Sequence, residues 1–353
     1  MSNNKCIRNE YIDFLKGIVI FLMIWAHCIQ YLPFDSMSGL WENNIVRYIY
    51  SFHMPLFSFI SGYLLWDTLR TKGIYHIVYS RCIGLTIPIV VWGSVQYILN
   101  IVKGNTSLSV INWIFAVTQG GFWFLYAVMF CSVLIAIIHI WLRNCRNELY
   151  AFIIMLILLV ISSHWIYSMR MIAYTYPFFT IGFLCNNHKT GMKRILNKYG
   201  SFAIVLFPLA LLYFHEDEYI YNTGIDIFTT KRSIIDQIVI DFFRWGLAAV
   251  GICFVIVVTK NIYICFKDKK IVSIIIETGK YSLQLYVMSS IIISGLLQML
   301  LSMYFQKYFE NTNVYINCYV FAPVLSYIII KFLTLISKKM ENTILGKILF
   351  GRM

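Results

Sequence analysis

Charged residues are scarce in this sequence. They make up 13% of its 353 residues, whereas soluble domains contain about 25%. Hydrophobic residues supply 59% of the chain, which is more than the roughly 45–50% typical of a soluble domain. They occur in runs long enough to cross a hydrocarbon core of about 30 Å. The scarcity of charge therefore excludes an ordinary soluble protein and predicts a membrane protein.

Paired cysteine spacings are also lacking. The nine cysteines are scattered, and several fall inside apolar runs, which favours small core residues over a disulfide or metal framework. We therefore expect no metal. The sequence shows no internal repeat, no low-complexity tract and no extramembrane stretch long enough for a second domain. We expect no cleavable signal peptide, and a single polytopic membrane domain over residues 1–353.

Apolar segments recur along the chain and predict an all-α integral membrane protein with about ten transmembrane helices. The segments cover roughly 11–31, 46–66, 82–101, 122–142, 149–165, 171–187, 199–214, 236–259, 282–304 and 315–336. Lysine and arginine gather in alternate loops, and the loops between these hold few. This bias explains the net charge of +13 without a nucleic-acid partner. By the positive-inside rule it predicts that both termini are cytoplasmic.

The first segment carries a polar stripe. At about 100° per residue, Lys16 lies about 60° and His27 about 40° from Asp13 on the same side of a helix. Ionisable residues in a membrane helix usually face protein or a water-filled cavity, and a buried imidazole is suited to act as a general base. The alternative is that Asp13 and Lys16 form an ion pair at the interface while His27 hydrogen-bonds inside the bundle.

Several motifs follow the stripe in order. Lys16 and His27 are separated by ten residues, and the second segment contains the run Phe52-His53-Met54-Pro55-Leu56-Phe57-Ser58-Phe59-Ile60-Ser61-Gly62-Tyr63. Arg81 precedes Ile87-Pro88, and Trp123-Phe124-Leu125 begins the fourth segment. Gly279-Lys280-Tyr281-Ser282-Leu283-Gln284-Leu285-Tyr286 lies near the ninth. Together these motifs resemble the acyltransferase-3 family of membrane O-acyltransferases, most closely its sugar O-acetylase branch.

The sequence departs from the family pattern at three positions. Lys16 stands where arginine is commoner, Gly84 where a second basic residue is common, and Ser289 where a late histidine often occurs. Lysine supplies a charge without the planar fork of arginine. The departures keep open a non-catalytic sensor or assembly partner that retains the family scaffold.

The resemblance implies transfer of an acyl group, commonly acetyl, from cytoplasmic acetyl-CoA to a hydroxyl of a glycan or lipid-linked sugar. It also implies an integral protein of the bacterial inner membrane, in contact with membrane lipid. A secondary transporter or flippase for a glycan or small metabolite is the alternative, because it too would use many helices and buried polar residues.

Residue roles follow from the resemblance and from the predicted topology. We expect His27 to be the general base and Asp13 to orient Lys16. Arg81 and Arg70 are candidates for binding the phosphates of coenzyme A. Candidate substrate contacts are Ser61, Trp123, Asp241 and Arg244. Each of these four also has a structural alternative, namely a close helix contact for Ser61, an interfacial anchor for Trp123 and mutual neutralisation for Asp241 and Arg244.

Overall fold

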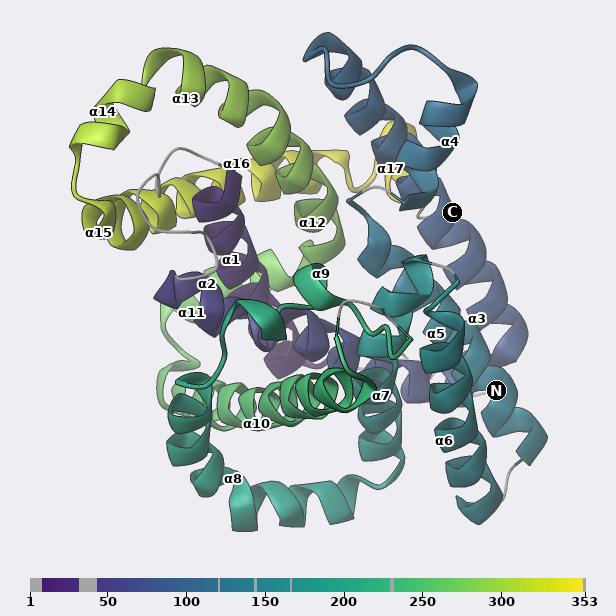
Figure 1. Ribbon diagram of the computed structural model, residues 1–353. Coiled ribbons are helices and arrows are strands. Elements are labelled where there is room, and N and C mark those ends of the chain that lie inside the picture. The colour runs from purple at the N-terminus through teal and green to yellow at the C-terminus, as the bar shows by residue number, and fades with distance from the viewer. Residues whose placement is uncertain are drawn as a thin grey trace.

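Every regular element that the computed structural model describes is a helix. The described residues are 8–31, 43–119, 121–142, 145–165, 167–228 and 232–351. Figure 1 shows the helices crossing one another at several angles, with α1 (Glu10–Tyr31) among them. Helix α1 contacts helices from the middle and from the end of the chain, including α3, α10, α11, α12 and α16. The all-α class predicted from the sequence is confirmed for these residues.

The second and third apolar segments form one long helical stretch. Helix α2 (Asn44–Tyr50) leads into α3 (His53–Val102). Pro55 lies in the first turn of α3, where its missing N–H removes no helical hydrogen bond. Gly73 interrupts α3 with φ 75° and ψ 177°, a conformation that glycine adopts far more readily than other residues. The two halves of α3 therefore correspond to the predicted segments 46–66 and 82–101.

The remaining elements continue the pattern of apolar helices joined by short connections. In chain order they are α4 (Val110–Gln119), α5 (Trp123–Leu142), α6 (Cys145–Ser162), α7 (Tyr167–Asn187), α8 (Lys189–Leu211), η2 (Glu216–Glu218), α9 (Ile220–Thr223), α10 (Ile234–Phe266), α11 (Lys270–Lys280), α12 (Ser282–Ile291), η3 (Ile292–Leu297), α13 (Gln298–Tyr304), α14 (Gln306–Asn311), α15 (Val314–Ile316), η4 (Asn317–Phe321), α16 (Ala322–Met340) and α17 (Ile344–Leu349). The elements η3 and η4 are π-helical turns, which occur mostly as local insertions in α-helices.

Six helical stretches among the described residues are long and apolar enough to cross a membrane. They are Glu10–Tyr31, Asn44–Val102, Trp123–Leu142, Ile234–Phe266, Ser282–Tyr304 and Val314–Met340. Each of the ten predicted apolar segments overlaps a helix of the structure. The protein is therefore an all-helical integral membrane protein, while the number of ten crossings and the cytoplasmic side of the termini stay predictions.

Two pairs of helices approach closely through glycine. A Cβ atom on Gly62 of α3 would lie 2.0 Å from the Phe179 carbonyl oxygen of α7, and one on Gly182 would lie 2.0 Å from the Phe59 carbonyl oxygen. On α1, a Cβ atom on Gly17 would lie 2.1 Å from the Ile275 carbonyl oxygen of α11. Small residues allow membrane helices to pack backbone against backbone. These contacts fix α7 on α3 and α11 on α1.

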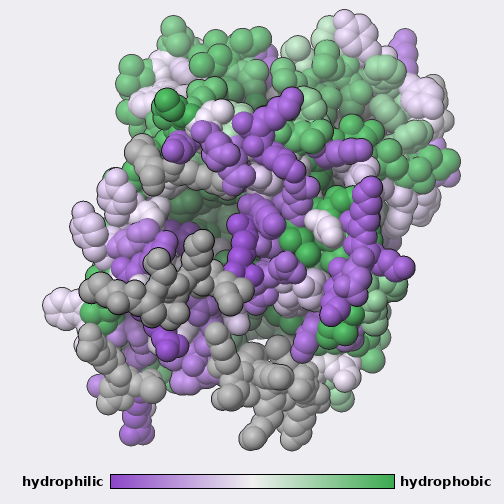
Figure 2. Space-filling model, turned by 180° about the vertical axis from the view of Figure 1, so that it is seen from behind, coloured by the Kyte–Doolittle hydropathy of each residue, from purple (hydrophilic) through white to green (hydrophobic). Residues whose placement is uncertain are grey.

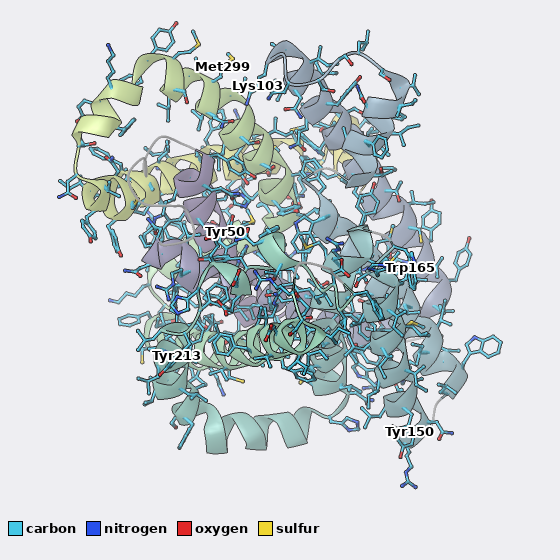
Figure 3. All side chains as sticks on the ribbon, viewed as in Figure 1. Tyr50, Lys103, Tyr150, Trp165, Tyr213 and Met299 are labelled. Atoms are coloured by element: carbon cyan, nitrogen blue, oxygen red, sulfur yellow. The ribbon has the colours of Figure 1, made fainter. Side chains whose placement is uncertain are left out.

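The surface of the protein suits a lipid surrounding. Large apolar side chains are exposed along the helices, for example Ile154 on α6 and Phe242 on α10. In Figure 3, Tyr50 lies among the helices, whereas Tyr150 and Tyr213 project at the edge of the molecule. In the reverse view of Figure 2, hydrophilic residues gather across the middle of the face, and hydrophobic residues cover its upper part. The apolar exterior is what a membrane protein presents to lipid tails.

Candidate active site

One face of α1 lines two cavities in succession. Lys16 and Ile20 line the first, and Met23, His27 and Gln30 line the second. The spacings of four, three, four and three residues keep these side chains on one side of the helix. Lys16 and His27 lie eleven residues, or about 16 Å, apart along the axis. The predicted polar stripe therefore reaches from one cavity to the other.

The second cavity, which we name the His27 cavity, has a volume of about 450 Å³. It is formed by α1, α2, α3, α4, α5, α7, α9 and α12 and by Gly121, which lies just before α5. Its lining is rich in aromatic and amide side chains. The lining residues are Met23, His27, Gln30, Tyr31, Tyr50, His53, Met54, Gln96, Thr118, Gly121, Trp123, Tyr126, Met171, Tyr221, Tyr286 and Ser290.

The Nδ1 atom of His27 is buried and has no hydrogen-bond partner among the residues that the structure describes. The ring packs against Tyr31 in a T-shaped arrangement, with a centroid distance of 5.8 Å. A buried polar nitrogen without a partner is costly, by about 1–3 kcal/mol, and unpaired groups of this kind concentrate where ligands bind. Among the described residues, the bundle supplies no hydrogen-bond partner for His27 Nδ1, and the role of His27 as a base stays a prediction.

His53, the second histidine of the cavity, is held differently. Its Nδ1 atom lies 2.9 Å from the Ile49 carbonyl oxygen. Because a carbonyl oxygen only accepts, Nδ1 carries the proton and donates, and Nε2 of the neutral ring is left as an acceptor. The ring packs on Tyr50 at 5.0 Å. His53 is therefore fixed in one orientation at the start of α3.

Several polar groups in the His27 cavity are oriented by the fold. Tyr50 donates to Gln30 Oε1, and Tyr286 donates to the Gly121 carbonyl oxygen at 3.2 Å. Gln96 Oε1 is buried and has no hydrogen-bond partner in the described part of the chain. Gln96 and His27 thus both line this cavity, and each has one buried polar atom without a partner among the described residues. Both groups are suited to a ligand that carries hydroxyl groups.

The first cavity, which we name the Lys16 cavity, has a volume of about 200 Å³ and is mostly apolar. Two cations, Lys16 and Arg81, are its charged residues. Its lining residues are Lys16, Ile20, Phe57, Ile60, Ser61, Leu64, Arg81, Leu85, Phe124, Leu125, Val128, Ser282, Leu283 and Tyr286. Tyr286 lines both cavities, so the two lie next to the same residue.

Asp13 holds Lys16 in place. Its Oδ1 atom lies 2.8 Å from Lys16 Nζ, and its carboxylate also accepts hydrogen bonds from Arg8. The Asp13 side chain is only 4% exposed and lines neither cavity. The sequence predicted this pair, and the structure adds Arg8 as its third member.

Of the other predicted site residues, some line one of the two cavities and the rest lie outside both. Ser61 and Trp123 line the Lys16 and His27 cavities, respectively. Ser61 donates to the Phe57 carbonyl oxygen at 2.8 Å, while its neighbour Gly62 forms the close contact with α7. Arg70 is exposed and lines neither cavity. Arg81 is therefore the only one of the two predicted arginines that reaches a described cavity.

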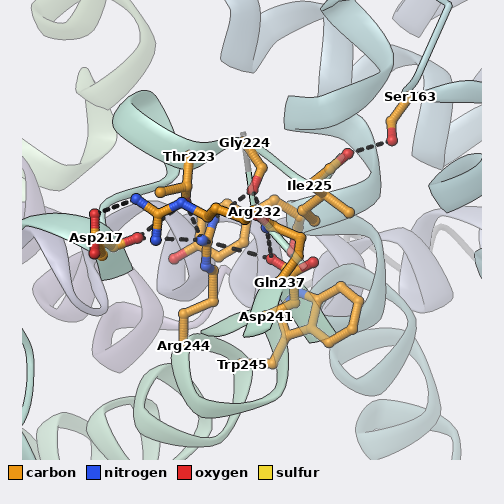
Figure 4. Close-up of polar contacts among 11 residues, drawn as sticks. Ser163, Asp217, Thr223, Gly224, Ile225, Arg232, Gln237, Asp241, Arg244 and Trp245 are labelled. Carbon is orange, nitrogen blue, oxygen red and sulfur yellow. Dashed lines mark hydrogen bonds and ion pairs between the residues drawn. The ribbon is translucent and has the colours of Figure 1, made fainter. Parts of the chain in front are cut away.

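Asp241 and Arg244 lie away from both cavities and anchor a loop (Figure 4). Arg244 is 1% exposed, donates to the Gly224 carbonyl oxygen at 2.9 Å and donates to Thr223 Oγ1. Gln237 donates to the same carbonyl oxygen and to Asp241 Oδ1, each at 3.1 Å. The Asp241–Arg244 pair itself spans 3.5 Å. This network holds the segment that carries Tyr221 into the His27 cavity.

A second contact holds the outer part of the same loop. Arg232 donates to Asp217 Oδ1, and this hydrogen bond lowers the pKa of the Asp217 carboxyl below its ordinary value. Tyr221 itself contacts Tyr50 at 5.9 Å and Trp123 at 6.3 Å. The three aromatic rings form one wall of the His27 cavity.

The sequence did not single out Gln30, Tyr50, Gln96 and Tyr221. Gln30 had a signal, because it follows His27 by three residues on the same helix face. Tyr50 precedes the motif that begins at Phe52 by two residues. Gln96 and Tyr221 had no local signal, since both belong to segments that join the cavity only through the fold. Among the described residues, no group of three or more His, Cys, Asp or Glu side chains could hold a metal ion.

Comparison with known proteins decides the family. The acyltransferase domain of the Acyl_transf_3 family matches residues 9–336. The chain belongs to the acyltransferase-3 family. The match includes every residue that lines the His27 and Lys16 cavities. The family assignment made from the sequence motifs is confirmed.

Two bacterial relatives accompany this acyltransferase-3 match. Nodulation protein NolL of Mesorhizobium japonicum is 28% identical over 228 residues, which cover 61% of this chain and 59% of that protein. Nodulation protein NolL of Sinorhizobium fredii is 30% identical over 186 residues, covering 52% and 49%. The aligned region thus spans about half to three fifths of these curated relatives. No solved structure matches the chain.

Proposed function

We propose that this acyltransferase-3 protein transfers an acyl group, in the simplest case acetyl, from cytoplasmic acyl-CoA to a hydroxyl of a glycan or lipid-linked sugar. One observation carries the proposal. His27, whose Nδ1 atom has no partner among the described residues, lines a polar, aromatic cavity that shares Tyr286 with a cation-bearing apolar cavity. In this proposal the base and the acceptor site lie in one cavity, and the donor site lies in the neighbouring cavity. We place the reaction in the bacterial inner membrane, where cytoplasmic acetyl-CoA and membrane-borne glycans can both reach the protein.

The Lys16 cavity fits the donor. Coenzyme A combines a phosphorylated nucleotide with a long, thin arm that ends in the thioester. Lys16 and Arg81 offer cations for the phosphates, and the apolar lining beyond them suits the arm. A volume of about 200 Å³ accommodates a narrow chain rather than the nucleotide. The nucleotide would then stay at the mouth of the cavity, with the thioester directed toward Tyr286 and His27.

The His27 cavity fits a sugar acceptor. Trp123, Tyr50 and Tyr221 supply aromatic rings, and an apolar ring face can cover the C–H face of a sugar while its rim stays polar. Gln96 Oε1, which lacks a partner, can accept from a sugar hydroxyl. A volume of about 450 Å³ lies within the 300–1,000 Å³ range common for small-ligand sites.

The chemistry requires one proton transfer and one acyl transfer. His27 takes the proton from the acceptor hydroxyl, and the oxygen attacks the thioester carbonyl carbon. The carbon–sulfur bond then breaks, and the thiolate of coenzyme A leaves and takes up the proton from His27. The product is an ester on the acceptor. Lys16, held by Asp13, would act on the donor side because about 16 Å of helix separates it from His27.

The direct test follows the acyl group. Purified protein in nanodiscs is supplied with acetyl-CoA labelled in the acetyl group and with lipid-linked glycans extracted from the host, and the products are analysed by mass spectrometry. Labelled ester on a glycan supports the proposal. Absence of label from every glycan fraction, combined with uptake of a labelled glycan or metabolite into sealed vesicles, would favour the transporter hypothesis instead.

A further inference from the structure

A groove separate from both cavities runs between α1, α11 and α16, which contact one another (Figure 1). We name it the α16 groove. Its volume is about 700 Å³, and it shares no lining residue with the His27 or Lys16 cavity. Its lining residues are Gly17, Ile18, Phe21, Lys270, Ile271, Ile274, Ile275, Glu277, Thr278, Tyr327, Ile330, Lys331, Thr334, Leu335 and Lys338.

The charges of the α16 groove are predominantly positive. Lys270, Lys331 and Lys338 line it, against one acidic residue, Glu277. Glu277 is already paired with Lys338 at 2.8 Å. Lys270 and Lys331 form no ion pair or hydrogen bond with any described residue. Two cations are therefore left uncompensated beside an apolar surface, a combination that favours a negatively charged amphiphile.

Lys331 is unusual in its position along the helix. It lies in the apolar stretch Val314–Met340, about nine residues before Met340, which corresponds to about 14 Å of helix. An unpaired lysine within a membrane helix is costly, by about 2.5–3.5 kcal/mol at the centre. Its long side chain can reduce this cost by reaching toward the interface. An anion from the membrane would remove the cost directly.

Thr334, one turn further along α16, provides an independent observation. It is 9% exposed, lines the groove, and its Oγ1 atom has no hydrogen-bond partner among the described residues. Helical threonines elsewhere in this protein behave differently. Thr259 donates to Val255 and Thr278 donates to Ile274, in each case to the carbonyl oxygen four residues earlier. The hydroxyl of Thr334 is thus buried in the wall of the groove without a hydrogen-bond partner among the described residues.

Helix α11 supplies the opposite wall of the groove. Ile271 and Ile274 of α11 are exposed, and the helix begins with Lys270 and ends with Lys280. A helix with one apolar side and basic ends typically lies at the membrane interface. Together, α11 and α16 place apolar side chains and lysines along the same groove. The lysines suit the phosphate of a phospholipid, and the apolar side chains suit its acyl chains.

We propose that the α16 groove binds one anionic phospholipid. The phosphate binds Lys331 and Lys270, and the hydroxyl of Thr334 donates to a phosphate or ester oxygen. One acyl chain lies against Ile271, Ile274 and Ile330. This site is distinct from the site of the proposed acyl transfer, because it shares no lining residue with the donor or acceptor cavity. Its occupancy can be measured without any enzymatic assay.

The test uses the full chain purified in a neutral detergent and freed of lipid. Phosphatidylglycerol and phosphatidylcholine with the same acyl chains are titrated separately, and bound lipid is counted by native mass spectrometry. We expect one phosphatidylglycerol to bind more tightly than phosphatidylcholine. Loss of one lysine weakens binding of an anionic lipid about five-fold, and we expect this for Lys331→Gln. Lys339→Gln is the matched control, because Lys339 is exposed on the same helix but does not line the groove.

Thr334→Val tests the hydroxyl contact, since valine keeps the shape of threonine and removes the donor. We expect weaker binding of phosphatidylglycerol with unchanged thermal unfolding of the lipid-free protein. Equal affinity for the two lipids would overturn the proposal. So would a Lys331→Gln protein that binds phosphatidylglycerol as tightly as the Lys339→Gln control.

Discussion

Arg244 on α10 donates a 2.9 Å hydrogen bond to the carbonyl oxygen of Gly224, three residues after Tyr221. This contact links a buried cation to the loop that closes one side of the His27 cavity. Asp241 and Arg244 therefore hold the loop that carries Tyr221, and they do not line the cavity themselves. In the proposed function, the hydrogen bond from Arg244 to Gly224 sets the position of Tyr221 against the acceptor.

Substitutions at Arg244 and Asp241 can distinguish an effect on folding stability from an effect on the position of Tyr221. Arg244→Met leaves Asp241 buried without its cation, a change that typically costs about 3–5 kcal/mol. The double variant Arg244→Met with Asp241→Leu removes both charges and should recover most of this stability in thermal unfolding. It cannot restore the hydrogen bond to Gly224. We therefore expect the KM for the acceptor to stay raised in the double variant while the KM for acyl-CoA is unchanged.

The control for this pair is Arg232→Gln, which removes an exposed contact of the same loop. Its effect on unfolding should be no more than about 1 kcal/mol. If the double variant regained both stability and the wild-type KM for the acceptor, a positioning role for Arg244 would be excluded.

The two arginines predicted to bind coenzyme A can be distinguished by the donor KM. Arg81 lines the Lys16 cavity, whereas Arg70 is exposed outside both cavities. Hydrogen bonds to charged groups contribute about 1.5–3 kcal/mol. We therefore expect Arg81→Gln to raise the KM for acetyl-CoA by about ten-fold or more, and Arg70→Gln to have a much smaller effect. Equal effects of the two substitutions would argue against the Lys16 cavity as the donor site.

Glycine contacts between helices set the packing of α3 on α7. Gly62→Ala would bring a methyl group to 2.0 Å from the Phe179 carbonyl oxygen, which the backbone cannot accommodate without moving. Overpacking of this kind costs about 1–3 kcal/mol. Gly246→Ala on α10 is the matched control, since no atom lies within 4 Å of the added Cβ. Thermal unfolding should show a lower Tm for Gly62→Ala than for wild type, and no such decrease for Gly246→Ala.

Low pH should weaken the Asp217–Arg232 pair, which holds the loop that carries Tyr221. The pKa of Asp217 is lowered by its hydrogen bond from Arg232, so the folded protein binds this proton less readily than the unfolded chain. The contribution of the pair is therefore present above the unfolded pKa of about 3.9 and is lost as the pH falls through the lower folded value. Because the carboxyl is exposed, the contribution is at most about 1 kcal/mol.

Thermal unfolding measured across this pH range checks the assignment. The difference in Tm between wild type and Asp217→Asn should be present at neutral pH and should shrink as the pH falls below about 4. Arg232→Gln should behave in the same way, because it removes the other half of the pair. A difference that grows in acid would contradict the assigned direction.

The sequence was informative where a feature lies within one helix. The stripe from Lys16 to His27 depends only on helical periodicity, and the structure places both residues in cavities along one face of α1. The Asp13–Lys16 pair was visible for the same reason. Apolar runs located the helices because the membrane requires about 20 apolar residues for a crossing.

Features that depend on distant segments could not be predicted. Tyr221 reaches the His27 cavity because Arg244 and Gln237 hold Gly224, and no local pattern around Tyr221 indicates these partners. The i,i+3 spacing of Asp241 and Arg244 predicted their pairing but not the loop that they hold. The break at Gly73 was equally hidden, since a lone glycine in a sequence does not reveal a positive φ.

The role of His27 as the general base can be tested through the turnover of acetyl-CoA with a glycan acceptor. The measurement compares release of the coenzyme A thiol by wild type, His27→Gln and His188→Gln in nanodiscs. His188 is exposed and lies outside both cavities, so His188→Gln should retain wild-type turnover. If His27 is the general base, we expect His27→Gln to lower kcat by about 10²–10⁴-fold. A His27→Gln protein that turns over at the rate of the His188→Gln control would contradict it.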